Sequence, residues 1–176
     1  SKLSYLHFAP TLQSKKNLIN ENIPDASIVV TGNTIIDTLF LGLKLINENK
    51  KIAMSFENKY DFKLQNKTVL ITGHRRENFG DGFIHICDAL VHLSSNFKDV
   101  NFVYPVHLNP NVKNVVEDKL NNIDNIFLIN PLGYLDFIFL MSKSYIILTD
   151  SGGIQEEAPS LNKPVLVMRN NTERPE

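Results

Sequence analysis

The sequence predicts an α/β fold with a Rossmann-like, doubly wound parallel sheet, and three observations point to it. Short apolar runs alternate with longer segments of helical periodicity along the whole chain. Nearly all residues within each run are apolar, as in parallel strands that helices cover on both faces. Glycines directly follow several runs, in the position of the loops at the carboxyl ends of such strands, where ligands bind.

The expected strands, in chain order, are Ser27–Thr31, Thr68–Thr72, Asn101–Val106, Asn125–Ile129, Tyr145–Thr149 and Pro164–Met168. The expected helices between them are Gly82–Phe97, a helix from Pro110 to near Leu120, Leu135–Ser142 and Gly153–Leu161. The first of these helices gathers its apolar residues on one face, at spacings of three and four. Pro110 suits the first turn of the second helix, where a missing N–H costs nothing.

Two further segments complete the expected organisation. Asn47–Asp61 is polar and is expected to be a surface excursion between two units. Tyr5–Ala9 is a lone apolar fragment, and the chain stops soon after a strand, without a closing helix. The chain is therefore expected to be part of a longer protein.

Composition excludes several classes of protein. The chain has 176 residues, of which 43% are apolar and 21% charged, which fits neither a disordered chain nor a membrane-spanning one. A net charge of −1 argues against nucleic acid or an anionic membrane as the main partner. Cys87 is the one cysteine, so no internal disulfide forms and a cytoplasmic location is expected.

Arginine is scarce and clustered. The chain has four arginines, Arg75 and Arg76 in one short stretch and Arg169 and Arg174 in another, although lysine is abundant. The planar guanidinium binds phosphate or carboxylate through two hydrogen bonds at once, as lysine does not. Both stretches are therefore candidates for anion binding.

The segment Thr149–Ala158, TDSGGIQEEA, runs from a strand through two glycines into a helix. A glycine turn lets a ligand approach the backbone, and the helix N-terminus offers unpaired N–H groups to a phosphate. A carboxylate one turn into the helix suits a ribose diol. The alternative is a tight turn in which Ser151 caps the helix and the glutamates favour its dipole.

Two more strand ends carry polar clusters. His74 opens the HRREN stretch after Gly73, which favours a site over a solvated loop with an Arg–Glu pair. His107 lies between two prolines, and this segment taken alone favours a satisfied loop residue over a ligand contact. The remaining histidines have no ligand partners at metal spacing, so no metal site is expected.

Taken together, the chain resembles the non-hydrolysing UDP-N-acetylglucosamine 2-epimerases over nearly its whole length. The matching segments are HFAPT (His7–Thr11), VTGNTIIDTL (Val30–Leu39), TGHRRENFG (Thr72–Gly80), YPVHLNPNV (Tyr104–Val112), PLGYLDFIFLM (Pro131–Met141) and TDSGGIQEEAPSLNKPVLVMRNNTERPE (Thr149–Glu176). HRREN and DSGGIQEEAPSL…TERPE are the most specific of these.

The resemblance implies a GT-B-like fold of two Rossmann-like domains with a UDP-sugar in the cleft between them. Residues 1–32 would be the tail of the N-terminal domain and the connection, and residues 33–176 the C-terminal UDP-binding domain, truncated at its end. The reaction would interconvert UDP-GlcNAc and UDP-ManNAc, for polysaccharide precursors, by eliminating UDP to give a 2-acetamidoglucal and adding it back. The family needs neither NAD nor a metal, and the resemblance implies a bacterial homodimer.

The resemblance also implies roles for individual residues. His74 would contact the phosphate and assist the departure of UDP, as an acid or by charge stabilisation. The diphosphate would be held by Ser151, Gly152 and Gly153. The ribose, the uracil and the leaving phosphate would be bound by Glu157, Phe137 and Arg174. Arg75 and His107 would contact a second UDP-GlcNAc that activates bacterial members.

The sequence departs from the family pattern in what it lacks. The carboxylates that move the C2 proton belong to the family's first domain, so this chain alone is expected to be inactive. A GT-B glycosyltransferase and a non-catalytic UDP-sugar-binding module are the alternatives. Epimerases acting on sugars modified at C3 or C6, or hydrolysing UDP, also stay open.

Overall fold

The structure is a computed structural model that describes residues 3–172, apart from the side chains of residues 62 and 63. The chain divides into two compact units, Ser1–Leu41 and Gly42–Glu176, and the boundary falls within helix α2 (Thr34–Glu48). The sequence placed a domain boundary earlier, after residue 32. Arg174 lies outside the described residues, so its predicted role has no structural counterpart here.

The first unit is a small β-α-β motif. Strand β1 (His7–Ala9) pairs in parallel with β2 (Ile28–Val30), and α1 (Leu12–Asn20) and a 3-10 turn, η1 (Asp25–Ser27), connect them. The hydroxyl of Thr11 caps α1 by accepting a hydrogen bond from the Ser14 N–H at 3.0 Å. The lone apolar fragment of the sequence thus supplies strand β1.

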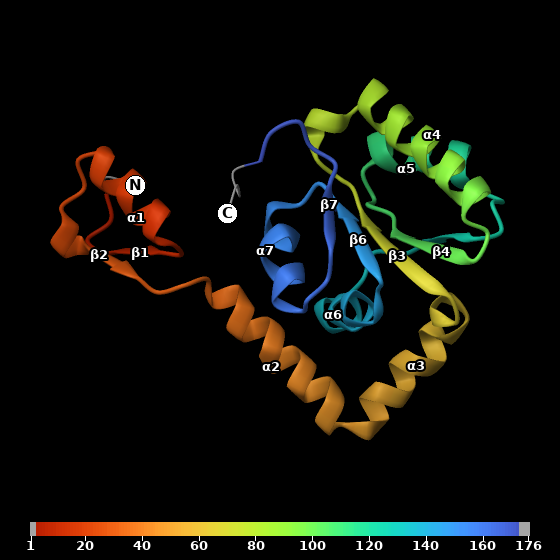
Figure 1. The fold of residues 1–176 in the computed structure, drawn as a ribbon, viewed down its shortest axis with the longest axis horizontal. Coiled ribbons are helices and arrows are strands. Elements are labelled where there is room, and N and C mark those ends of the chain that lie inside the picture. Colours follow the sequence, from red (N-terminus) through yellow and green to blue (C-terminus); the bar gives the residue numbers. More distant parts are fainter. Residues whose placement is uncertain (1–2, 173–176) are drawn as a thin grey trace. The chain divides into compact units, whose positions relative to one another are not determined.

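The second unit contains a five-stranded parallel sheet in the order β5-β4-β3-β6-β7. Its strands are β3 (Lys67–Thr72), β4 (Val100–Pro105), β5 (Ile126–Ile129), β6 (Ile146–Thr149) and β7 (Val165–Val167). The chain starts at the central β3, builds outward to β5, and then returns to place β6 on the other side of β3 (Figure 1). The doubly wound parallel sheet predicted from the sequence is confirmed.

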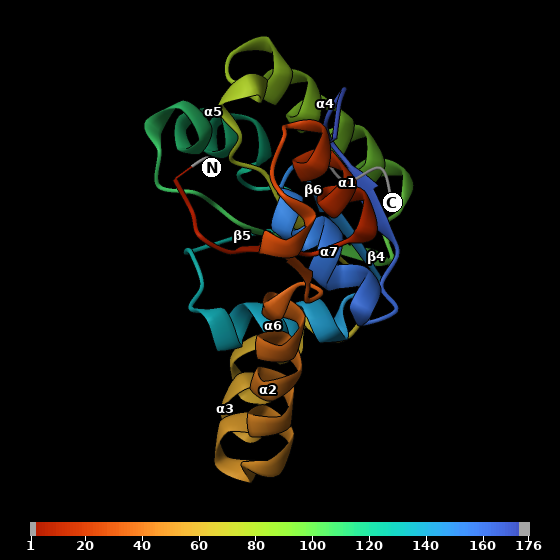
Figure 2. The ribbon, with the colours of Figure 1, turned by 90° about the vertical axis from the view of Figure 1, so that its left-hand side faces the viewer.

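Helices cover both faces of this sheet. They are α3 (Lys50–Leu64), α4 (Asp81–Asn96), α5 (Pro110–Leu120), α6 (Tyr134–Lys143) and α7 (Gly152–Ser160), with a 3-10 turn, η2 (Arg76–Asn78), before α4. Figures 1 and 2 show α4 and α5 together on one face, and α3, α6 and α7 on the other. Two layers of helices explain why the strand sequences are so uniformly apolar.

The expectation of a surface excursion over Asn47–Asp61 was wrong, because most of this segment belongs to α3. The segment is polar overall, but a short apolar stripe on α3 packs on the side that faces the sheet. The buried ring of Tyr60 stacks on Phe139 of α6 with 6.1 Å between ring centroids, and Phe56 approaches the same ring at 5.4 Å. Asn49 caps the helix by accepting hydrogen bonds from the N–H groups of Lys51 and Ile52.

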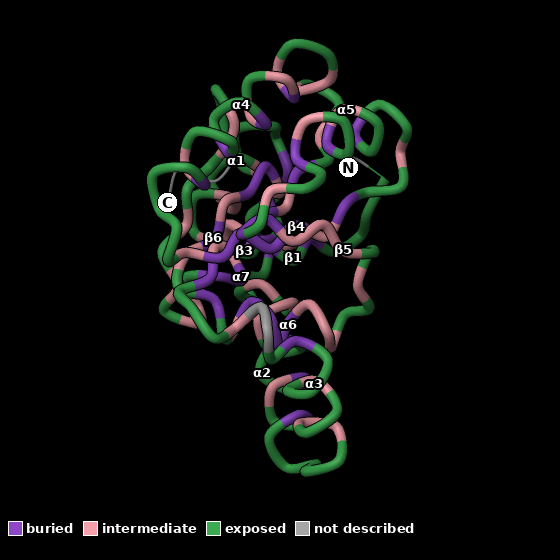
Figure 3. Tube along the Cα trace, turned by 90° about the vertical axis from the view of Figure 1, so that its right-hand side faces the viewer, coloured by how far each residue is buried: buried purple, intermediate pink, exposed green. Residues whose placement is uncertain are grey.

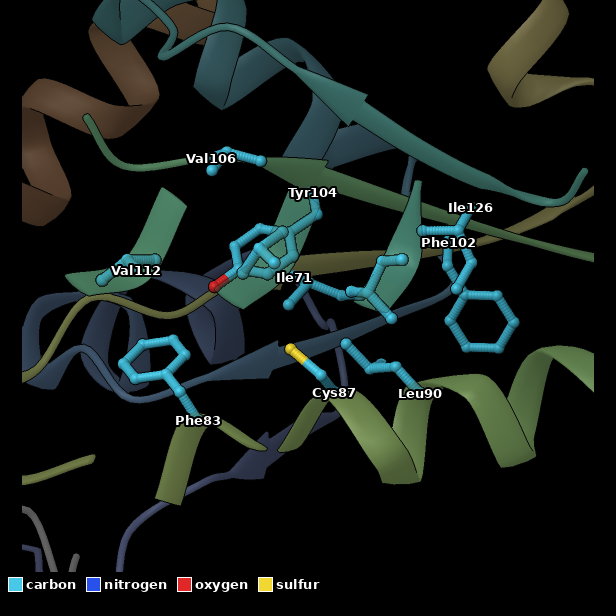
Figure 4. Close-up of a cluster of buried hydrophobic side chains, with 11 residues drawn as sticks. Ile71, Phe83, Cys87, Leu90, Phe102, Tyr104, Val106, Val112 and Ile126 are labelled. Atoms are coloured by element: carbon cyan, nitrogen blue, oxygen red, sulfur yellow. The ribbon is translucent and has the colours of Figure 1, made fainter. Parts of the chain in front are cut away.

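The core of the second unit lies between α4, α5 and the sheet (Figure 4). Buried residues gather along the central strands in Figure 3, as expected for a sheet covered on both faces. Cys87 is completely buried in this core, and burial raises the pKa of its thiol to about 11. Cys87 is therefore a packing residue, as expected from its helical face.

Candidate functional site

The candidate site lies where the sheet reverses its winding direction. Strands β3 and β6 are neighbours in the sheet, but the chain leaves them toward opposite edges. At such a switch point the loops that follow the two strands diverge and leave a crevice for a ligand. The two most informative sequence motifs follow these two strands: HRREN follows β3 and DSGG follows β6.

Asp150 joins the two loops. It is fully buried, and its Oδ2 accepts hydrogen bonds from the backbone N–H groups of His74 (2.9 Å) and Arg75 (2.8 Å). Oδ2 also accepts a bond from Nδ2 of Asn78 at 3.1 Å. The first residue after β6 therefore fixes the backbone of the loop after β3.

The second oxygen of Asp150 faces the imidazole of His74. Its Oδ1 lies 3.3 Å from Nδ1 of His74 and has no hydrogen bond within residues 3–172. Burial by itself would raise the pKa of the Asp150 carboxyl. The His74 side chain and the N–H groups of Arg75 and His74 outweigh burial, so this pKa lies below its usual value and the carboxylate is charged at neutral pH.

Gly73 lets the β3 loop pass close to β4. Tyr104 is fully buried on β4, and its hydroxyl donates a hydrogen bond to the carbonyl of Gly73 at 3.0 Å. A Cβ at position 73 would lie only 2.8 Å from that hydroxyl oxygen. Position 73 therefore requires glycine, because the loop backbone lies too close to the Tyr104 hydroxyl for a side chain. The hydrogen bond from Tyr104 also fixes where the loop begins relative to the sheet.

A pocket of about 430 Å³ opens beside this loop and is rich in basic groups. His74 and His107 line it, with their rings stacked at 5.7 Å between centroids and 21° between planes. Nε of Arg75 is buried and lacks a hydrogen-bond partner within the described part of the chain. The remaining lining residues are Arg76, Glu77, Phe79 and Asn109. Such a pocket suits an anionic ligand.

The start of α7 forms the second half of the site. Ser151 precedes the helix, and its side chain makes no capping hydrogen bond, so the capping alternative raised from the sequence is not what the structure shows. The first-turn N–H groups of α7, from Gly152 and Gly153 onward, have the geometry that binds phosphate at helix N-termini. A Cβ on Gly153 would lie 3.9 Å from the Ser151 hydroxyl and 3.5 Å from Oε1 of Glu157. These groups therefore converge around one backbone position.

Glu157 is 7% exposed, and its Oε2 has no hydrogen bond to any described residue. Burial, and then the neighbouring charge of Glu156, raise the pKa of its carboxyl. A buried carboxylate with an unused oxygen costs stability and is a group that a ligand hydroxyl could satisfy. Burial, and then the charge of Glu157, raise the pKa of the Tyr134 phenol in the first turn of α6.

Phe137 lies in that same part of α6, where its N–H donates to the Gly133 carbonyl at 3.0 Å and its side chain is half-buried. The structure thus brings His74, Arg75 and His107 together in one pocket and Ser151, Gly152, Gly153 and Glu157 at one helix start. Phe137 lies on α6, and among the described residues no hydrogen bond or ring contact joins it to the second group. The assignment of these residues to a ligand stays a prediction.

Sequence reasoning missed one contributor, Asp150, and did not identify the partner of another, Arg169. Asp150 was part of the quoted motif but was given no role, although its place as the first residue after β6 was a usable signal. Arg169, whose side chain is 9% exposed, places its Nε 2.6 Å from Oε1 of Glu77. This ion pair joins the two arginine-bearing stretches and supports η2 from the side of β7.

Other possible sites are weaker. A second pocket of about 450 Å³ lies between α3, α5 and the segment after β5, and Lys59 and Lys113 line it. Both lysines are paired with carboxylates of the chain, and no predicted site residue lines this pocket. Across residues 3–172 no group of three or more His, Cys, Asp or Glu is arranged to hold a metal, and no helix has the length and apolar character to cross a bilayer.

Comparison with known proteins gives one consistent family. The family model described as UDP-N-acetylglucosamine 2-epimerase matches residues 1–176. A Campylobacter jejuni protein named UDP-N-acetylglucosamine 2-epimerase is 56% identical over 178 residues, covering 99% of this chain and 46% of that protein. The chain thus spans about half the length of the curated relatives it matches.

Solved structures show the same likeness. The UDP-GlcNAc 2-epimerase of Neisseria meningitidis, solved with UDP-GlcNAc bound, superposes with a TM-score of 0.95 at 50% identity, over 99% of this chain and 47% of that one. The S. aureus protein MnaA, solved with UDP, superposes with a TM-score of 0.88 at 46% identity, over 99% of this chain and 44% of that one.

Proposed function

The chain belongs to the UDP-N-acetylglucosamine 2-epimerase family, and from this premise we propose that it is the UDP-binding, C-terminal part of an enzyme that interconverts UDP-GlcNAc and UDP-ManNAc. The observation that carries the proposal is the junction at the switch point. There Asp150 ties the His74 loop to the loop that begins α7, so a phosphate bound at the helix N-terminus would lie beside an imidazole.

In this proposal the diphosphate binds to the Ser151 hydroxyl and to the N–H groups at the start of α7. The helix dipole and the unpaired N–H groups favour its negative charge. The unused carboxylate oxygen of Glu157 accepts hydrogen bonds from the ribose diol, and Phe137 lies by the uracil. Arg174, outside the described residues, would hold the leaving phosphate.

His74 serves the bond-breaking step. When the C1–O bond breaks, the electron pair goes to UDP, the C2 proton is lost to a base, and a C1–C2 double bond forms in the 2-acetamidoglucal. A protonated or hydrogen-bonding imidazole at the phosphate stabilises the charge that develops on UDP. Re-addition of UDP from the same position, with protonation of C2 on the opposite face, gives the epimer.

The C2 proton is moved, in this proposal, by carboxylates in the part of the relatives that this chain does not cover. C2–H is a weak acid and needs a positioned base, so the chain alone is expected not to catalyse epimerisation. Arg75 and His107 would contact a second UDP-GlcNAc that activates the enzyme. The homodimer, the cytoplasmic location and the role in polysaccharide precursor synthesis also stay predictions.

Titration calorimetry on the 176-residue chain tests the nucleotide site. UDP should bind more tightly than uridine, since the diphosphate contacts at α7 are absent for uridine. Glu157→Gln should raise the Kd for UDP by about 10-fold, which is the effect of losing one charge-assisted hydrogen bond. Asp88→Asn, which alters an exposed carboxylate on α4, is the matched control and should leave the affinity unchanged. Equal affinity for UDP and uridine would contradict the proposed diphosphate site.

In this proposal activity requires the half of the relatives that the 176 residues do not cover. Replacing the matching segment of the Campylobacter jejuni relative by this chain gives a complete protein in which deuterium incorporation at C2 of UDP-GlcNAc can be followed in D2O. The chimera should exchange C2 and interconvert the two sugars, whereas the chain alone should not. Exchange by the isolated chain would show that the proton-transfer groups lie within it.

A further inference from the structure

We infer that Asp150 is a positioning residue for His74: one carboxylate holds the loop backbone with Oδ2 and selects the protonation site of the imidazole with Oδ1. This inference rests on the proposed role of His74 at the leaving phosphate. It assigns to Asp150 a function in the same reaction without direct contact with the substrate.

The geometry first fixes the orientation of the carboxylate. Oδ2 accepts three hydrogen bonds, from the N–H groups of His74 and Arg75 and from Nδ2 of Asn78, at 2.8–3.1 Å. With three donors on one oxygen and complete burial, the carboxylate plane has no freedom to turn. Oδ1 is therefore held toward the ring of His74.

The position of Oδ1 then decides which ring nitrogen carries the proton. Nδ1 of His74 lies 3.3 Å from Oδ1, and a carboxylate oxygen is an acceptor only. The neutral imidazole is thus favoured with its proton on Nδ1, and Nε2, the nitrogen turned away from Asp150, is left to exchange a proton or hydrogen bond with the ligand. His107 stacks on the same ring and limits its rotation.

The substitution Asp150→Asn separates this role from a structural one. The amide oxygen can keep the three hydrogen bonds of Oδ2, so the loop retains its backbone. The amide nitrogen then occupies the Oδ1 position and donates to Nδ1, which moves the ring proton to Nε2. Flipping the amide would point NH2 at three N–H donors and lose all three bonds, so the flip is unfavourable.

Nitrogen-15 spectra of the histidine rings test the inference directly, because protonated and bare ring nitrogens have distinct shifts. At a pH where the ring is neutral, wild-type His74 should carry its proton on Nδ1, and Asp150→Asn should move it to Nε2. His85, exposed on α4, is the internal reference and should not change. A proton on Nε2 in the wild-type chain overturns the inference, and this reading needs no variant to fold.

Kinetics in the Campylobacter jejuni chimera provide the second readout. Asp150→Asn should lower kcat by about 10²-fold, because the amide NH2 opposes protonation of Nδ1 and so disfavours the imidazolium that donates from Nε2 to the leaving phosphate, while KM for UDP-GlcNAc stays within about 3-fold. Asp88→Asn should leave both unchanged. A shifted proton with full kcat, or a raised KM with unchanged kcat, overturns the positioning role.

The two proposals fail in different ways. If His74→Ala keeps full kcat, or the wild-type chimera is inactive, the proposed function fails. The ring spectra still decide whether Asp150 sets the protonation site of His74.

Discussion

Replacing Gly73 by Ala should destabilise the second unit through a clash with one identified atom. The new Cβ would lie 2.8 Å from the Tyr104 hydroxyl oxygen, below any normal contact, and 3.4 Å and 3.5 Å from Phe83 and Met168. Tyr104 is completely buried on β4, an interior strand of the sheet, so its ring has little room to move away. Displacing its hydroxyl also removes the hydrogen bond to the Gly73 carbonyl.

The loss of unfolding free energy is the sum of two costs, one for the clash and one for the lost hydrogen bond. Overpacking a tight core site costs about 1–3 kcal/mol. Leaving a buried hydroxyl and carbonyl unpaired costs about 1–3 kcal/mol more. The free energy of unfolding should therefore fall by about 2–6 kcal/mol, a large share of the stability of a domain this size.

Urea unfolding of four chains measures the clash itself: wild type, Gly73→Ala, Tyr104→Phe and the double variant. Tyr104→Phe loses the hydrogen bond and should cost about 1 kcal/mol. In the double variant the missing hydroxyl relieves the clash, so it should be more stable than the sum of the single effects predicts, by about 1–2 kcal/mol.

Gly82→Ala is the matched control. Gly82 lies in the first turn of α4, where a Cβ meets only ordinary contacts at 3.5 Å, so alanine should stabilise the chain by about 0.5–1 kcal/mol. Wild-type stability of Gly73→Ala, or strict additivity in the double variant, would refute the close-approach explanation.

Three further predictions follow from the site. Burial raises the pKa of the Glu157 carboxyl, so the folded chain binds the carboxyl proton more tightly than the unfolded chain does. The free energy of unfolding should therefore fall as the pH rises from about 4.5 through the raised pKa. Glu157→Gln should abolish that fall, which a series of urea titrations at different pH values measures. Arg169→Ala should cost about 1–2 kcal/mol and speed amide exchange in η2, because Glu77 loses its buried partner; unchanged exchange would contradict this support role. In the chimera, His107→Ala should chiefly weaken activation of the reverse reaction by added UDP-GlcNAc, and an activation curve equal to wild type would exclude His107 from the activator site.

Much of the fold was predictable because parallel strands covered on both faces must be apolar throughout. Five of the strand predictions coincide with β3 to β7 to within a residue or two, and Pro110 marks the start of α5. Helix α3 was not predicted, because only a few of its apolar side chains, such as Phe56 and Tyr60, face Phe139 and the rest of its surface is polar. A pattern that sparse has little periodicity to detect.

Local patterns in the sequence predicted which loops form the candidate site, since a glycine after an apolar run and a dense polar cluster are local features. They did not determine which loops meet. His74, His107 and Asp150 follow β3, β4 and β6, and these strands are neighbours only because the chain builds the sheet outward from β3 in both directions. The contact between His74 and Asp150 therefore spans 76 residues of sequence. Such a contact depends on strand order, which local residue patterns do not specify, and only the tertiary structure places the buried carboxylate beneath the histidine.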